Sequence, residues 1–151
     1  MVDFFETEHK LTLDQIENVE LKFGINFPDE YKSHLLKFNG GRCKPNKFSF
    51  NENGKTTNSI LDWFLAIHDG KYDNLIRYYN RYKREEKRLP DPIFPIAHDP
   101  GGNLICMSEK DGKVYFWDHE KEVNYLVEDD DNYSNLFLIS NSFEEFLDAL
   151  H

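Results

Sequence analysis

The fold is decided by the stretch IFPIAHDPGGNLICMSEKDGKVYFW, residues 93–117, which holds three short β-forming runs separated by turn residues. Pro100-Gly101-Gly102 forces a turn after the first run. Asp111-Gly112 suits the tight turn of a hairpin between the other two runs. The prolines of the first run are typical of an edge strand, because proline cannot donate to a strand ladder. The stretch therefore predicts a largely antiparallel sheet.

Downstream of this stretch, residues 123–127 predict a third strand that continues the meander, and 136–139 form another short apolar run. A last helix follows, because Ser142 and Glu145 have the spacing of a capping box. Its predicted buried face consists of Phe143, Phe146, Leu147 and Leu150.

Upstream of the stretch, two helices come before any strand. The first begins at a capping box of Thr12 and Gln15 and runs to about Phe23. The second begins at Pro28, whose fixed φ suits a first helical turn. It ends at the Asn-Gly-Gly triplet 39–41, because these residues tolerate positive φ.

The middle of the chain is less regular. Residues 47–50 alternate as a strand does, 51–58 predict a polar loop, and the apolar run 60–67 fits either a buried strand or the start of a helix. Residues 74–88 predict a third helix. This order lacks the strict alternation of strands and helices that parallel sheets show. We therefore expect a single α+β domain over residues 1–151, with a mainly antiparallel sheet and helices packed against it.

The composition fits one domain with an ordinary core, since 39% of the 151 residues are hydrophobic and 15% are aromatic. No apolar run approaches the roughly 20 residues that span a bilayer, and the acidic start differs from a secretory signal, so we expect a cytoplasmic protein. Cys43 and Cys106 are too few for a disulfide framework and are expected to be buried thiols. The sequence predicts no cofactor and no metal.

The charge is acidic and unevenly distributed. Eighteen basic and 28 acidic residues give a net charge of −10. This charge opposes binding to nucleic acid or an anionic membrane and favours a basic partner. Residues 118–151 hold ten acids and one base, including the Glu-Asp-Asp-Asp run 128–131, whereas 71–88 hold seven bases and three acids. We expect one acidic and one basic region on the surface, unless these two segments face each other in the fold.

Two pairs of histidine and acid residues are candidates for metal binding or general acid–base chemistry: His98-Asp99, and His119 beside Asp118 and Glu120. No third ligand follows at a recognised spacing, so we interpret them as polar residues of loops and strand ends. The glycine pairs at 40–41 and 101–102 lack the strand before and the helix after that a phosphate loop needs. Catalytic chemistry is therefore not indicated.

Four arginines fall at steps of four, three and four along the third predicted helix, interleaved with tyrosines: Arg77, Arg81, Arg84 and Arg88. Such a row of arginines can bind the phosphates of a nucleic acid while the tyrosines stack on its bases. The tyrosines, however, have core spacing, and Glu85 can pair with the arginines on either side. A solvated face, or an internal partner for the acidic segment, is the favoured interpretation.

Two blocks of the sequence carry a family resemblance. They are FPDEYK at 27–32 with Leu35-Leu36 and Asn-Gly-Gly at 39–41, then IFPIA at 93–97 with DPGGNLIC at 99–106 and VYFWDHE at 114–120. Together with the terminal helix, these blocks resemble the SUKH superfamily in its Smi/Knr-type branch over nearly the whole chain. Phe27 replaces the usual Leu, and Pro100 stands where Gly or Ser is often found. The first change keeps an apolar residue, and the second keeps a turn.

The resemblance implies a non-enzymatic protein that acts by binding. Bacterial members are typically immunity proteins encoded beside polymorphic toxins, many of them nucleases, whereas fungal relatives are interaction proteins in cell-wall regulation. The leading hypothesis is a non-catalytic immunity protein that neutralises a cognate, basic toxin by occlusion. The alternatives are a regulatory adaptor without a toxin and a metal-dependent hydrolase that uses His98, Asp99, Asp118 and His119.

The resemblance does not place the binding face, because its motif residues form turns and core. Adjacent carboxylates steer a basic partner, and tryptophan is prominent among interface anchors. The residues expected to bind the partner are therefore Glu128, Asp129, Asp130 and Asp131, with Trp63 and Trp117 as the rival anchors. The identity of the toxin and the oligomeric state are left open.

Overall fold

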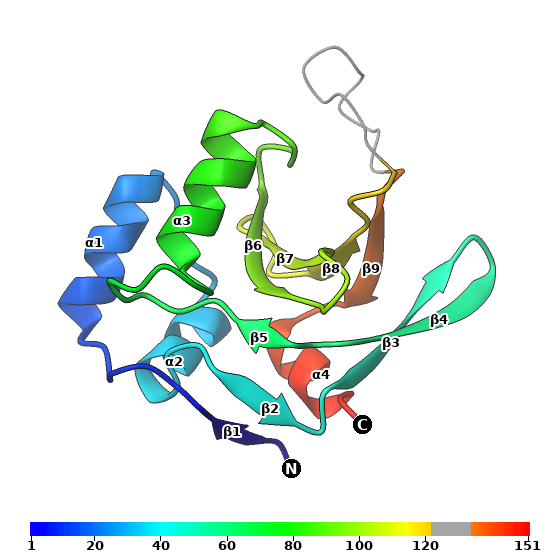
Figure 1. Ribbon diagram of the computed structural model, residues 1–151, viewed down its shortest axis with the longest axis horizontal. Helices are drawn as coiled ribbons and strands as arrows, with labels where there is room; N and C mark the ends of the chain where they lie inside the picture. The colour runs from blue at the N-terminus through cyan, green and yellow to red at the C-terminus, as the bar shows by residue number, and fades with distance from the viewer. Residues whose placement is uncertain (122–133) are drawn as a thin grey trace.

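A five-stranded antiparallel sheet forms the centre of the computed structural model, which describes residues 1–121 and 134–151 (Figure 1). Its strands, in spatial order, are β5 (Trp63–Phe64), β6 (Ile93–His98), β7 (Leu104–Ser108), β8 (Val114–Trp117) and β9 (Leu136–Ser140). Two small antiparallel sheets pair β1 (Asp3–Phe5) with β2 (Arg42–Lys44), and β3 (Lys47–Glu52) with β4 (Lys55–Ile60). The expectation of an α+β fold with a mainly antiparallel sheet is confirmed.

The helices lie around this sheet (Figure 1). They are α1 (Leu13–Phe23), α2 (Asp29–Lys37), α3 (Leu75–Tyr79), the π-helix η1 (Asn80–Glu85) and α4 (Phe143–Asp148). Helix α4 contacts both β9 and α2, α1 contacts α2, and α3 packs against β6. No helix of the described ranges is long and apolar enough to cross a membrane.

Local signals place the ends of these helices. The capping box of α1 is confirmed, because the Gln15 N–H donates to the Thr12 hydroxyl at 3.2 Å and the Thr12 N–H donates to the Gln15 side chain at 2.9 Å. Ser142 caps α4 by accepting from the Glu145 N–H at 3.1 Å. The Glu145 carboxylate reaches back to the N–H of Asn141 at 3.3 Å, so the predicted box is displaced by one residue.

Both faces of the central sheet are buried. Leu104 and Cys106 of β7 belong to a cluster beneath η1, whereas the alternate residues Ile105 and Met107 belong to the larger core formed with α1, α2 and α4. Strands buried on two faces carry continuous apolar runs, as β7 does.

Both cysteines are buried, free thiols, as predicted, and burial raises the pKa of Cys43 to about 11.

The prediction of an edge strand over 93–97 is wrong, since β6 lies between β5 and β7. The short β5 pairs with Ala97 and His98 of β6, and Pro95 lies beyond its end. Pro95 therefore faces no partner strand on that side, and a shift of register after Pro95 accommodates it against β7.

The prediction of a polar loop over 51–58 is also wrong. Strand β3 covers residues 51–52 and β4 covers 55–58, and the two strands pair through a turn at Asn53 and Gly54, which have φ values of 53° and 88°. The hairpin projects beyond the central sheet (Figure 1), and β4 is largely exposed. An exposed strand needs no apolar alternation, so its polar sequence carried no strand signal.

The third helix is not one α-helix over 74–88. Helix α3 ends at Tyr79, and η1 continues with wider turns to Glu85. The wider turns shift the side chains that follow, so a pattern read with a period of 3.6 misplaces them. The strand predicted over 123–127 lies outside the described residues.

An aromatic cage surrounds His34 on α2. The imidazole is 8% exposed, and its ring centre lies 4.9 Å from those of Phe4 and Phe143. Burial, together with the nearby charge of Lys37, lowers the pKa of His34 from 6.5 to about 4. The folded protein therefore holds this ring neutral.

We predict that acid destabilises the fold through His34. Between pH 6.5 and 4 the His34 ring takes up a proton in the unfolded chain but not in the folded protein. The free energy of unfolding is therefore unaffected by His34 above pH 6.5 and falls by about 3 kcal/mol as the pH reaches 4. Urea unfolding at a series of pH values measures this slope. His34→Met keeps the volume without a titrating group and should flatten the slope, whereas His9→Gln, at an exposed position, should not. Equal slopes in wild type and His34→Met would contradict the prediction.

Candidate functional site

The buried amide of Asn39 joins three segments at the end of α2. Its Nδ2 donates to the carbonyl oxygens of His9 and Ile67, both at 2.9 Å, and its Oδ1 accepts from the Ile67 N–H at 2.8 Å. The Asn39 carbonyl also accepts from the Glu8 N–H at 2.9 Å. Since the side chain is only 2% exposed, these bonds are shielded from water. Asn39 therefore fixes the N-terminal segment against the chain that follows β5.

Two glycines continue this junction. Gly40 has a φ of 69°, and a Cβ there would lie 2.4 Å from the Cβ of Ala66. Gly41 has a φ of 91°, and a Cβ there would lie 2.6 Å from the carbonyl oxygen of Phe5. Both positions need glycine for backbone conformation and for close packing. The Asn-Gly-Gly triplet thus holds two distant segments in contact.

The loop after β5 is closed by its own hydrogen bonds. The Gly70 N–H donates to His68 Nδ1 at 3.0 Å, so the ring proton lies on Nε2, which donates to the Tyr72 carbonyl at 2.9 Å. Asn74 Nδ2 donates to the carbonyls of His68 and Gly70 at 2.7 and 2.9 Å. The loop therefore presents Asp69, Lys71 and Tyr72 from a fixed backbone.

An open groove of about 570 Å³ lies between the N-terminal segment and this loop. We call it the Trp63 groove; its side chains include Glu6, Glu8, His9, Trp63, His68, Asp69, Lys71, Tyr72 and Asp73. Four of these are carboxylates and one is a lysine. The groove is therefore acidic.

Trp63 lies half-buried in the groove on β5. The Arg42 guanidinium lies over its ring, 5.2 Å from the centre, and pairs with the Asp62 carboxylate at 3.1 Å. Trp63 is paired in register with His98 of β6, so the two side chains lie on one face of the sheet. The central sheet therefore supports one wall of the groove.

His98 ties the edge of the groove to the sheet. Its Nε2 lies 2.6 Å from the Asp73 carboxylate, its Nδ1 lies 2.9 Å from the Asp99 carbonyl oxygen, and the Tyr78 ring stacks on it at 5.8 Å. Both ring nitrogens face oxygen acceptors. His98 therefore connects the Asp73 carboxylate, at the edge of the groove, to the central sheet.

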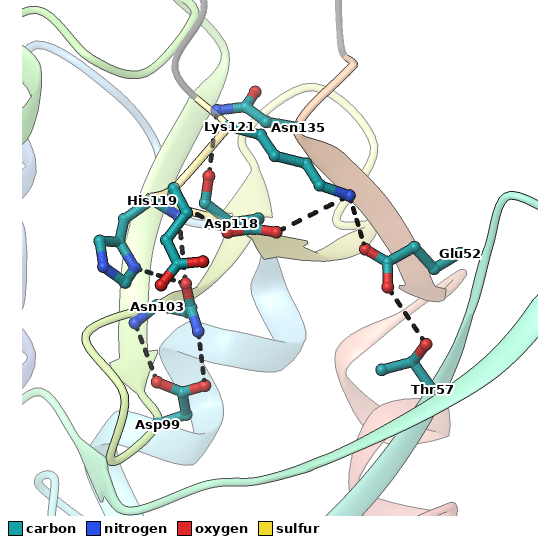
Figure 2. A network of polar contacts seen from close by, with 9 residues as sticks. Glu52, Thr57, Asp99, Asn103, Asp118, His119, Lys121 and Asn135 are labelled. Carbon is teal, nitrogen blue, oxygen red and sulfur yellow. Dashed lines mark hydrogen bonds and ion pairs between the residues drawn. The ribbon is translucent and has the colours of Figure 1, made fainter.

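A second polar cluster lies at the end of the sheet where β7 begins and β8 ends (Figure 2). The Asp99 carboxylate accepts from the backbone N–H groups of Gly101 and Asn103 at 2.9 and 2.8 Å, and from Asn103 Nδ2 at 3.0 Å. Asn103 Oδ1 in turn accepts from His119 Nδ1 at 2.6 Å. These bonds shape the Pro-Gly-Gly turn.

The other half of this cluster reaches the β3–β4 hairpin (Figure 2). Lys121 Nζ lies 2.9 Å from the Glu52 carboxylate and 3.9 Å from that of Asp118. The Asp118 N–H donates to the Asn135 carbonyl at 3.0 Å. Residues 121 and 135, which lie just before and two residues after the segment 122–133, are therefore both held by the cluster.

The sequence matches the SMI1/KNR4 family (SUKH-1) over residues 10–149. The chain belongs to this family. It is similar to the SPbeta prophage-derived uncharacterized protein YokK of Bacillus subtilis (strain 168), with 32% identity over an alignment of 162 residues. The alignment covers 92% of this chain and 74% of YokK.

Family membership confirms the resemblance, and the structure extends the meaning of its first block. The Asn-Gly-Gly triplet was predicted only to end a helix. In this SUKH-1 chain, Asn39 also makes the buried bonds that build one end of the Trp63 groove. An asparagine before two glycines was the available signal, but its bonding partners are remote in sequence.

The structure separates the two tryptophans. Trp63 lies in the groove, and its role in binding stays a prediction. Trp117 is 0% exposed, because it lies beneath η1 with the Arg88 guanidinium 4.8 Å from its ring centre. A side chain so covered cannot contact a partner in this conformation, and we assign Trp117 to the core. The acidic run 128–131 lies outside the described residues.

The four residues considered for hydrolase chemistry do not converge. His98 bonds Asp73, Asp99 closes its own turn, and His119 bonds Asn103. Asp118 accepts from the Glu120 N–H at 3.0 Å. In residues 1–121 and 134–151, no group of three or more His, Cys, Asp or Glu side chains could hold a metal ion.

Three of the four arginines are engaged within the fold. Arg81 and Arg88 both pair with Glu86, at 2.8 and 3.0 Å, rather than with Glu85 as predicted. The Arg84 guanidinium donates to the Lys22 carbonyl and lies over the Tyr79 ring at 5.5 Å. The wider turns of η1 account for the changed partner. These contacts favour a structural role over phosphate binding.

We predict that Asn39→Ala lowers the free energy of unfolding by about 2–4 kcal/mol, because the carbonyls of His9 and Ile67 and the buried Ile67 N–H lose their partner. Urea unfolding measures the change. The matched control is Asn46→Ala, since the Asn46 side chain donates one long bond of 3.4 Å to the Leu61 carbonyl, and its loss should cost under about 1 kcal/mol. Equal losses in the free energy of unfolding for the two variants would show that Asn39 contributes no more than a single side-chain hydrogen bond.

Proposed function

We propose that this SUKH-1 protein is a non-catalytic immunity protein that binds a cognate, basic toxin and neutralises it by occlusion. The observation that carries the proposal is the match to the family over residues 10–149, because this family is associated with immunity to polymorphic toxins. The prophage origin in the name of YokK agrees with a bacterial setting. The proposal concerns binding and requires no catalytic group of the chain.

The distribution of charge supports a basic partner. Of the net charge of −10, half comes from residues 122–133, which hold five acids and no base. The Trp63 groove adds a second acidic region. A toxin that acts on nucleic acid needs a basic surface, and an acidic inhibitor associates with such a surface quickly through long-range attraction.

The polar cluster of Figure 2 supports the proposal that the acidic segment takes part in attracting the toxin. Lys121 and Asn135 lie just before and two residues after the segment, and both belong to the cluster. Lys121 is therefore held beside the β3–β4 hairpin, and Asn135 is held beside the end of β8. We propose that Glu128, Asp129, Asp130 and Asp131 steer the toxin towards the protein.

We predict that the protein protects cells from the product of a toxin-like gene beside its own. Replacing Glu128, Asp129, Asp130 and Asp131 by Gln or Asn should slow association at low salt by about tenfold and flatten its salt dependence, with less effect on dissociation. Binding kinetics at two salt concentrations measure both rates.

The matched control neutralises four exposed acids elsewhere, Asp14, Glu85, Glu144 and Asp148. This variant has the same net charge but should keep most of the association rate. Equal slowing in both variants would show that net charge, and not the acidic run, steers the toxin. Failure of the wild-type protein to protect would overturn the immunity proposal and favour the regulatory adaptor.

A further inference from the structure

We infer that the Trp63 groove is a docking site for an arginine or lysine side chain on a loop of a protein partner. The inference rests on the proposed function for the identity of the partner. The chemistry of the bound group follows from the residues of the groove alone.

The groove contains negative charge that the chain itself does not neutralise. Glu6 and Asp69 are exposed and form no hydrogen bond or ion pair with the described part of the chain, and the Glu8 carboxylate lies 4.0 Å from His68 Nδ1. His68 is the neutral Nε2–H tautomer in this geometry, because its Nδ1 accepts from Gly70. Lys71 is the one lysine of the lining. The groove therefore attracts a cation and repels phosphates and carboxylates.

Aromatic rings lie in the groove together with these carboxylates. Trp63 lies half-buried within the groove, and Tyr72, on the closed loop, is 73% exposed. Both rings already lie near cations of the chain itself, Trp63 near Arg42 at 5.2 Å and Tyr72 near Lys71 at 5.6 Å. Tryptophan and tyrosine faces attract guanidinium and ammonium groups. An incoming arginine would have aromatic surface for its planar group and carboxylates for its N–H donors.

The size and rigidity of the groove suit a loop of a protein partner. A volume of about 570 Å³ accommodates the tip of a loop with long side chains and not only a single ion. Its walls are ordered before binding by the Asn39 and Asn74 side chains. A rigid site loses little conformational entropy when it binds. These features fit a structured basic loop of a protein.

The probe for a direct test is N-acetyl-arginine amide, with N-acetyl-citrulline amide as the neutral control of nearly the same shape. Titration followed by protein NMR should show saturable shifts for the Trp63 indole and the Tyr72 ring with the arginine compound. The citrulline compound should bind about tenfold more weakly, because it lacks the charge. Equal binding of the two compounds, or shifts confined to other residues, would overturn the inference.

Variants test the assigned residues with the same probe. Glu6→Gln, Glu8→Gln and Asp69→Asn together should weaken binding about tenfold, while the charge-matched set Asp14→Asn, Glu85→Gln and Asp148→Asn should leave it within about twofold. Lys71→Met should tighten binding about threefold, because it removes a like charge and the cation beside Tyr72. A gain of affinity cannot arise from misfolding. Weaker binding by Lys71→Met would overturn the inference.

The cell-protection assay separates this inference from the proposed function. Loss of protection in the groove triple variant, with protection kept in the charge-matched set, supports both. Full protection by the groove variant would overturn the groove as the docking site and leave the immunity proposal intact. If the wild type does not protect, the immunity proposal fails, and arginine-selective binding at Trp63 alone decides whether the groove is a cation site.

Discussion

The structure depends on one buried side chain, the amide of Asn39. Its bonds satisfy backbone groups of two segments that are nearly 60 residues apart in sequence, at a place where water cannot do so. The glycines that follow let those segments approach more closely than any side chain would allow. The N-terminal segment, the end of α2 and the chain after β5 therefore form one unit, and the Trp63 groove is the space that this unit leaves open.

Burial on both faces of the central sheet explains why apparently chemical residues have structural roles. Helices α2 and α4 cover one face, and η1 covers the other, so Trp117 and Cys106 lie inside. Polar groups at the sheet ends must then find partners within the fold. His98 and Asp73 bond each other, as do Asp99, Asn103 and His119. Residues that suggested a hydrolase are those that close turns and hold strand ends together.

The acidic character acts at two ranges in the proposed mechanism. Net charge extends over many ångströms and governs how fast a basic partner arrives. A groove with carboxylates beside Trp63 and Tyr72 acts only at contact, where shape and desolvation decide how long the partner stays. Because the long-range attraction and the contact in the groove come from different residues, substitutions in the groove can change which partner binds. The net charge still attracts basic surfaces after such substitutions.

Sequence alone determined the features that depend on neighbours along the chain. The N-caps of α1 and α4 and the β7–β8 hairpin follow from short-range chemistry, and the two motif blocks identified the family. Tertiary structure decided what depends on remote covering. It made β4 a strand, placed β6 inside the sheet and buried Trp117, because exposure is set by whatever packs on top. It also joined Glu6 and Glu8 to Asp69 and Tyr72 in one groove, since no local pattern records which distant segments a buried amide will hold together.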